Sequence, residues 1–156
     1  MNSLIRMRIV AVAAIMFVGV GAFVVAEEMK KSVGVKEIIW PADKIEFKAV
    51  VPGVTQAVLW GDPTKGKYGA ITKFAAGIKH PLHTHSSDIK MVVISGTLII
   101  GSEGVEHKLS PGSYILAPAG KKHTSGSDAG SECMFFEEGS GKFTMTMVDD
   151  KTDMKK

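Results

Sequence analysis

The sequence contains very little cysteine, and this scarcity excludes one class of protein. Cys133 is the only cysteine among 156 residues, so no disulfide can form within the chain. It stands in the apolar run Glu132-Cys133-Met134-Phe135-Phe136, where we expect a buried and unreactive thiol. A disulfide-stapled scaffold is therefore excluded.

The chain also carries little net charge, because basic and acidic residues nearly balance. The formal net charge is +3, and two of the basic residues, Arg6 and Arg8, belong to an N-terminal segment that we expect to be removed. Without them the balance falls from 19 basic residues to 17, against 16 acidic residues. A chain this close to neutral has no electrostatic footprint for nucleic acid, so we expect no nucleic-acid partner.

Long apolar runs are absent except at the N-terminus. Residues 9–25 carry no charge, Arg6 and Arg8 precede them, and Val24 and Ala26 are short residues at the positions that a signal peptidase reads. We therefore predict a signal peptide over residues 1–26, cleaved after Ala26, and a periplasmic or secreted protein with no membrane partner after cleavage. The alternative is an uncleaved membrane anchor, since about 17 apolar residues can span a bilayer.

Sustained helical periodicity is missing from the rest of the chain. Short runs rich in Val, Ile, Phe, Thr and Tyr alternate with Gly, Pro and Asp, which predicts many short strands and an all-β domain over residues 37–148. Residues 27–36 read as a flexible leader and residues 149–156 as a disordered tail. The expected strands cover residues 37–40, 45–50, 55–60, 69–74, 90–94, 97–100, 107–109, 114–117, 133–137 and 143–148.

One apparent motif is rejected. Residues 61–67, Gly-Asp-Pro-Thr-Lys-Gly-Lys, have the glycine and lysine spacing of a phosphate-binding loop. Tyr68 follows where that loop needs Ser or Thr, and a strand pattern follows where it needs a helix. We therefore interpret the segment as a surface turn between two strands.

Histidines carry the clearest chemical signal. His83 and His85 are two residues apart, and alternate side chains of an extended chain share a face, which allows two imidazoles to bind one ion. His123 follows a strand and a Pro-Gly turn that reverses the chain, so it is a third candidate ligand. The alternative is that the three histidines line a metal-free interior.

The segments around these histidines resemble the two motifs of the cupin superfamily. The first motif, G-x₅-H-x-H-x₃₋₄-E-x₆-G, is matched by Gly77, His83, His85 and Gly96. The second, G-x₅-P-x-G-x₂-H-x₃-N, is matched by four further residues: Gly112, Pro118, Gly120 and His123. The match runs over residues 77–127, about a third of the chain, and a 15-residue gap separates the motifs.

This resemblance implies a single-domain, jelly-roll-like cupin barrel (a double-stranded β-helix) with an ion bound inside it, and homodimers formed by exchanging edge strands. The chain departs from the motifs at two positions. Ile89 replaces the carboxylate ligand and Ser127 replaces the closing Asn. Asp88, one residue before Ile89, is a candidate fourth ligand if the strand is shifted by one residue; a solvated turn residue is the alternative.

Several other polar or aromatic residues have two interpretations. Glu137 and Glu138 end an apolar strand, and one of them is a candidate replacement carboxylate or general base. Lys90 is a candidate partner of Asp88 or of an anionic substrate, or a residue that simply points outward. Solvent exposure is expected for His80 and His107, and packing or a place in the pocket wall for Trp60.

The resemblance leaves the reaction open. The expected cofactor is one divalent transition metal ion (Fe, Mn, Zn or Ni), since imidazole suits all four. One hypothesis is a metal-dependent enzyme of dioxygenase, isomerase or hydrolase type that acts on a small organic molecule. The alternatives are a non-catalytic, metal-dependent binding or sensor protein with a small-molecule ligand, and a structural cupin without an ion. The sequence identifies no catalytic residue.

Overall fold

A computed structural model of the chain describes residues 36–149. The chain divides into two units, and the second, which begins at Ile38, holds every described strand. The predicted signal peptide and almost all of the predicted leader and tail lie outside the described residues. Within residues 36–149, no helix has the length and apolarity needed to cross a bilayer.

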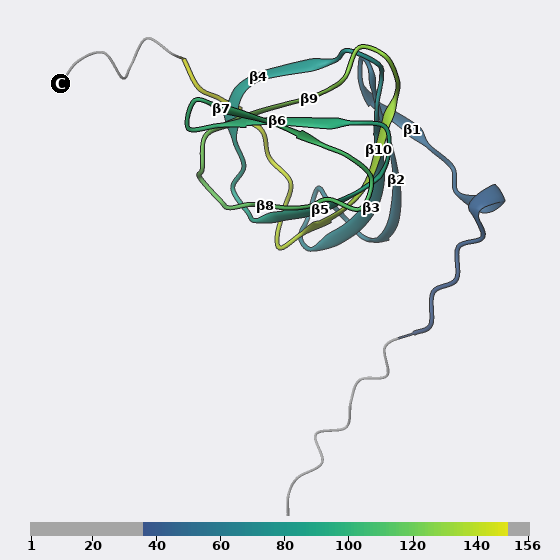
Figure 1. The fold of residues 1–156 in the computed structure, drawn as a ribbon. Helices are drawn as coiled ribbons and strands as arrows, with labels where there is room; N and C mark the ends of the chain where they lie inside the picture. The colour runs from purple at the N-terminus through teal and green to yellow at the C-terminus, as the bar shows by residue number, and fades with distance from the viewer. Residues whose placement is uncertain (1–35, 150–156) are drawn as a thin grey trace, which may run out of the picture. The chain divides into compact units, whose positions relative to one another are not determined.

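Two antiparallel sheets make up the second unit, and Figure 1 shows β4, β9 and β6 on one side and β8, β5 and β3 on the other. The first sheet contains, in spatial order, β1 (Lys48–Val51), β2 (Val54–Gly61), β3 (Tyr68–Phe74), β10 (Cys133–Gly139), β5 (Ile89–Ser95) and β8 (Tyr114–Ala117). The second sheet contains β11 (Thr146–Met147), β4 (Lys79–Thr84), β9 (His123–Ser127), β6 (Leu98–Ser102) and β7 (Val105–Leu109).

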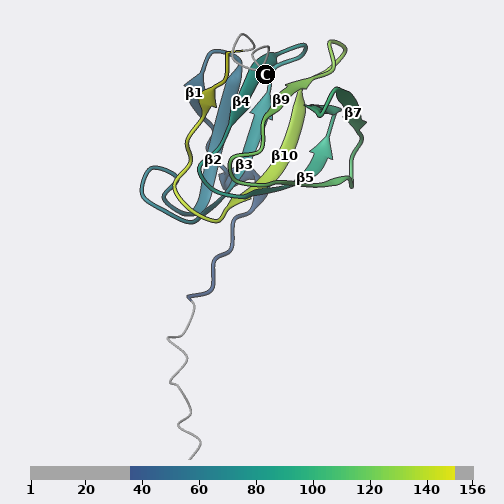
Figure 2. The same cartoon turned by 90° about the vertical axis from the view of Figure 1, so that its left-hand side faces the viewer.

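The predicted all-β, jelly-roll-like class is confirmed, with one correction about closure. The strand ladders form two separate sheets and do not join into a closed barrel. Neighbours such as β3 and β10, or β4 and β9, are far apart in the sequence but pair side by side in the sheets (Figure 2). Long-range pairing of this kind lets the two sheets enclose one interior.

Most predicted strands are found, with ends moved by at most three residues, but β4 and β9 were not among the predicted strands. The strand expected at residues 37–40 is wrong, because this stretch is irregular and leads into a short 3-10 helix, η1 (Ala42–Lys44). Pro41 stands at its N-cap, and a proline cannot donate a ladder hydrogen bond. The strand expected at residues 143–148 shrinks to the two residues of β11.

Alternation along the strands builds the core. β5 buries Ile89, Met91 and Val93 and exposes the residues between them, whereas β10 buries Cys133 and Phe135 and leaves the residues between them half-buried. The side chains from both sheets form one cluster, which includes Leu98 and Ile100 of β6. Cys133 is completely buried, as predicted, and burial raises the pKa of its thiol to about 11.

Gly96 makes the predicted tight turn between β5 and β6. Its φ of +72° lies in the left-handed region, which glycine adopts at little cost. A side chain at this position would also collide with the backbone of Glu132. Geometry therefore explains why this position of the first motif is a glycine.

Candidate metal centre

The structure brings together the three histidines that the sequence singled out. One ring nitrogen from each of His83, His85 and His123 lies within 4.8 Å of the other two, and all three residues are buried. Nitrogen ligands bind transition metals at about 2.0–2.1 Å, so small rotations of the rings allow one ion to contact all three. The prediction that these histidines converge is confirmed.

Strand pairing produces this convergence. His83 on β4 lies directly opposite His123 at the start of β9, and their ring centroids are 4.3 Å apart. His85 lies one residue beyond the end of β4, on the face that His83 uses, and its ring centroid is 5.0 Å from each of the others. Two neighbouring strands therefore position all three ligands.

Hydrogen bonds fix which nitrogen of each ring is free. The Nδ1 atoms of His83, His85 and His123 lie 2.7, 2.6 and 3.1 Å from the backbone carbonyl oxygens of Pro81, Thr144 and Lys121. A carbonyl oxygen only accepts, so each Nδ1 must carry the proton and donate. This leaves a lone pair on each Nε2, which is the tautomer that a metal ligand needs.

The protonation preferences fit the same role. Burial lowers the pKa of His83 to about 4 and also lowers the pKa of His85, so both rings are neutral at pH 7. His83 Nε2 is buried and has no hydrogen-bond partner. A buried acceptor without a partner costs about 1–3 kcal/mol, and coordination of a cation would satisfy it. These residues therefore fit a transition-metal ion.

Asp88 lies outside this cluster, and we remove it from the ligand set. Its Oδ1 accepts a hydrogen bond of 2.8 Å from the backbone N–H of Ala119, in the loop that leads to His123. The next residue of that loop, Gly120, donates to the carbonyl oxygen of His85 at 2.8 Å. Asp88 therefore holds the β8–β9 loop of the second motif, and Ile89 beside it is a buried core residue.

Ser127 also has a structural role in place of the usual Asn. Its hydroxyl donates to the carbonyl oxygen of Ala75 at 2.5 Å, and its N–H donates to the carbonyl oxygen of Ile78 at 3.0 Å. These bonds fasten the end of β9 to the connection before β4. The position thus preserves the alignment of the two strands that carry the ligands.

A C-terminal segment, residues 140–145, borders the centre, and the sequence did not predict this. The carbonyl of Thr144 accepts from His85, and the Thr144 hydroxyl accepts from the N–H of Ser86 at 2.9 Å. The ring of Phe143 lies 5.2 Å from the ring of His85. In the sequence, the only signal for the contact between residues 140–145 and the centre is that Ser86 and Thr144 are polar.

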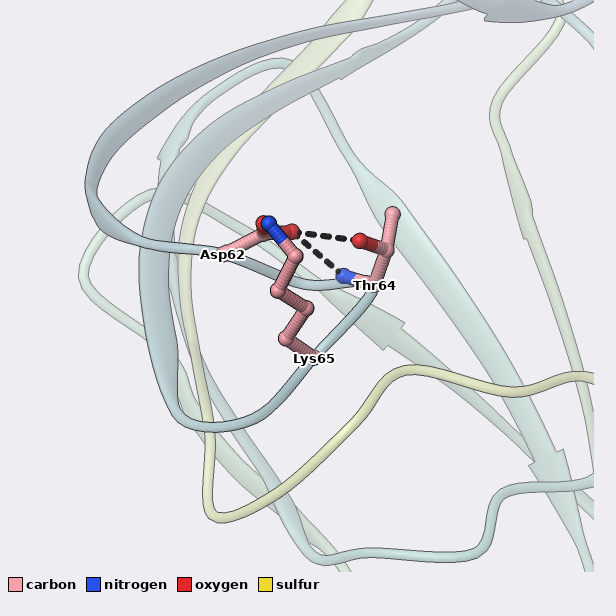
Figure 3. Close-up of polar contacts among 3 residues, drawn as sticks. All are labelled: Asp62, Thr64 and Lys65. Atoms are coloured by element: carbon pink, nitrogen blue, oxygen red, sulfur yellow. Dashed lines mark hydrogen bonds and ion pairs between the residues drawn. The ribbon is translucent and has the colours of Figure 1, made fainter.

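The turn at residues 61–67, which is not a phosphate-binding loop, holds the segment 140–145 in place. The N–H of Phe143 donates to the carbonyl oxygen of Pro63 at 2.8 Å, in the turn between β2 and β3. In this turn Asp62 accepts hydrogen bonds from the N–H and hydroxyl of Thr64 and pairs with Lys65, as Figure 3 shows. These bonds lower the pKa of Asp62 to about 2. The surface-turn interpretation is confirmed.

Glu137 is the second polar feature of the interior. It is 5% exposed, on the face of β10 that also carries Phe135. Its Oε1 accepts from Gln56 Nε2 at 2.6 Å and from the Tyr68 hydroxyl at 3.3 Å, and Thr72 also donates to the carboxylate. Burial nevertheless raises the pKa of Glu137 to about 7.

Phe143 links this carboxylate to the histidines. Its ring centroid lies 6.5 Å from that of Tyr68, which donates to Glu137, and 5.2 Å from that of His85. One phenyl ring therefore separates the Glu137 network of the first sheet from the metal centre of the second.

The other candidates lie away from the centre. Glu138 points outward and pairs with Lys90 at 3.1 Å, so Lys90 does not pair with Asp88. Trp60 covers Gly69 on the outer face of the first sheet and does not wall the interior. His107 is exposed, as expected, whereas His80 is half-buried, with Nδ1 3.2 Å from Ser125 Oγ.

Comparisons with known proteins agree with this architecture. The chain aligns with the polyketide cyclase RemF from Streptomyces resistomycificus at a TM-score of 0.64 and 16% identity, over 76% of this chain and 89% of that one. An RmlC-like cupin from Ralstonia eutropha gives 0.62 and 20%, over 75% of each chain. The DMSP lyase DddQ from Ruegeria pomeroyi gives 0.55 and 15%, over 68% and 62%.

At these identities the structural neighbours show a shared fold. No curated protein matches the sequence. The model of the ChrR cupin-like domain family matches residues 35–142, which is more than half of the chain and includes both histidine motifs. This chain belongs to the ChrR cupin-like domain family.

Proposed function

We propose that this protein is an exported, metal-dependent cupin enzyme that acts on a small organic molecule. The observation that carries the proposal is the set of three buried imidazoles whose Nδ1 atoms all donate to backbone carbonyls, which leaves three Nε2 lone pairs beside one another. Expected ions are Fe, Mn, Zn or Ni. A bound ion would supply Lewis acidity at a site with a ligand position left for a water molecule or a substrate oxygen.

Glu137 favours catalysis over simple binding. A carboxyl group with a pKa of about 7 is populated in both protonation states at neutral pH, which suits proton transfer. Perturbed carboxyl groups concentrate at functional sites, although structural networks perturb them as well. We assign Glu137 the role of proton donor or acceptor, oriented by Gln56, Tyr68 and Thr72.

The neighbours support a small-molecule substrate. A polyketide cyclase and a DMSP lyase share this fold, so the two-sheet interior accommodates enzymes with unrelated small substrates. These proteins give no guide to the particular substrate here, because fold alone does not determine reaction.

The alternative is a metal-dependent binding or sensor protein, and one observation favours it. Glu137 accepts hydrogen bonds from three side chains, which is also the pattern of a carboxylate retained for structure. A binding protein would hold its ligand without changing it, and this difference separates the two proposals.

Turnover assays with a matched pair of variants test the enzyme proposal. Metal-loaded protein is incubated with an extract of small molecules from the source cells, and changes are followed by mass spectrometry. We expect metal-dependent loss of one compound, with Glu137→Gln slower at unchanged metal content and Glu106→Gln, on the exposed strand β7, equal to wild type. Retention of a compound without conversion would instead support the binding protein.

Export and dimerisation are two further parts of the proposal. The apolar run at residues 9–25 and the short residues at 24 and 26 support export, and N-terminal sequencing of mature protein should begin at Glu27. The outer face of the first sheet supports a homodimer. Val92 and Tyr114 lie opposite each other there, and both are exposed. Exposed apolar side chains gathered on one sheet face are typical of protein interfaces.

A further inference from the structure

Two methionines lie next to the histidine pair, although they are far from it in the sequence. The run Met145-Thr146-Met147 lies antiparallel to His83-Thr84-His85, with Thr146 opposite Thr84 and Met147 opposite His83. Met145 comes just before β11 and directly after Thr144, whose carbonyl accepts from His85. An M-x-M run therefore lies beside the H-x-H run in the second sheet.

The register brings Met147 and His83 especially close. Val148 N–H donates to the carbonyl oxygen of Leu82, which makes those residues a hydrogen-bonded pair. Pairs alternate along antiparallel strands, so Met147 and His83 form a non-hydrogen-bonded pair, in which the Cα atoms stand about 4.5 Å apart. Directly opposite residues project to the same face, and His123 lies on the other side of His83. Met147, His83 and His123 form one cross-strand row.

The methionine side chains are free to approach the centre. Met147 is 56% exposed and Met145 36% exposed, so neither is committed to the core. Met147 lies on the edge strand of the second sheet, next to the strand that carries His83. A flexible thioether in this place can turn toward the imidazoles without a cost in core packing.

The donor set as a whole favours a soft ion of low charge. Among the described residues, no carboxylate joins His83, His85 and His123 in this cluster, and Ile89 occupies the position where the motif has a carboxylate. Three neutral imidazoles and a thioether carry no charge that offsets the charge of a buried ion, so a singly charged ion costs less to bury here than a divalent one. Thioether ligands select Cu(I), which carries a single charge.

We propose that Met147 supplies a fourth, thioether ligand and makes this centre selective for Cu(I). The inference rests on the proposed three-histidine metal site, but it changes the expected ion from a divalent metal to Cu(I) and gives Met147 the ligand position that a water molecule or substrate would otherwise take. Met147 takes the place that the missing carboxylate leaves open, and Met145 beside it serves as a second thioether at the rim.

Cu(I) affinity, measured anaerobically by competition with a chromophoric Cu(I) chelator, tests this inference. We expect Met147→Leu to weaken Cu(I) binding by at least about tenfold to hundredfold, since this is the range for the loss of a group that only orients a metal ligand. Zn(II) affinity, measured by calorimetry, should change far less. Met134→Leu on β10 is the matched control and should bind both ions like wild type.

X-ray absorption of the Cu(I)-loaded protein gives an independent readout. Wild type should show a sulfur neighbour of copper that Met147→Leu lacks. Equal Cu(I) affinity and equal spectra for the two proteins would overturn the thioether assignment. Wild type that binds Zn(II) through the histidines but does not bind Cu(I) would also overturn it and leave the metal site standing. Wild type that binds neither ion would overturn the metal site itself.

Discussion

His83 on β4 lies directly opposite His123 on β9, and their ring centroids are 4.3 Å apart. One cross-strand pair thus joins the two sequence motifs of the family, and the backbone ladder between the strands sets the distance between the ligands. Interactions that hold this ladder and its loops should therefore stabilise the fold around the metal centre without contacting the ion.

The bond from Asp88 to the loop before His123 gives the first prediction. Asp88→Ala removes the acceptor for Ala119 N–H, and a hydrogen bond of this kind contributes about 0.5–1.5 kcal/mol. We expect urea unfolding to show a loss of stability in that range and metal titration to show unchanged stoichiometry. Loss of the bound metal in Asp88→Ala would restore Asp88 as a ligand.

Glu137 predicts a pH dependence of stability with a definite sign. Its pKa rises from 4.5 in the unfolded chain to about 7 in the folded protein, so the folded protein binds the proton more tightly. Stability from this carboxyl is full below pH 4.5 and is lost as pH rises toward 7, by about 3 kcal/mol in total.

Urea unfolding between pH 4.5 and pH 8 in a chelator, with Glu137→Gln as the comparison, measures this effect. The histidines act in the opposite direction: the pKa of His83 and His85 is lowered, so their contribution is lost as pH falls below 6.5. Because both proteins share the histidines, their difference isolates Glu137. A difference in stability that does not change with pH would contradict the assignment.

The exposed outer face of the first sheet predicts self-association. Tyr114 is 60% exposed, and a charge in the middle of an apolar interface is costly. We expect Tyr114→Asp to convert a dimer to a monomer in light scattering coupled to size exclusion. Val105→Asp, at an exposed apolar position on β7 of the other sheet, should remain dimeric. A monomeric wild type would refute the proposed dimer.

Local signals in the sequence predicted most of the fold. Alternating apolar residues and Gly-Pro turns located most strands, because burial on one face leaves a period of two in the sequence. The expected strands did not include β4 and β9, which carry the histidines and are too polar to show that pattern. The strand expected at residues 37–40 failed because apolar residues there meet no partner strand and remain exposed. Closure was also overestimated, since alternation within each strand says nothing about whether the sheet edges join.

The candidate site was predictable where the motifs fix it and unpredictable where tertiary pairing decides. His83, His85 and His123 were identified from the spacing of the first pair, the turn before His123 and the resemblance to the cupin motifs. For Asp88 the sequence left a metal ligand and a turn residue as alternatives, because its side chain accepts from a backbone N–H thirty-one residues away and no local pattern records that contact. Contacts of Thr144, Phe143 and Met147 depend on where the C-terminal segment returns to β4, and only the structure contains that information.

The metal content of protein purified without added metal tests the central claim most directly. Elemental analysis of wild type should give close to one transition-metal ion per chain, and the double variant His83→Ala/His123→Ala should give essentially none. His107→Ala, at an exposed histidine on β7, should keep the wild-type content. Folded wild-type protein that carries no ion and takes up none when transition metals are supplied would contradict the account.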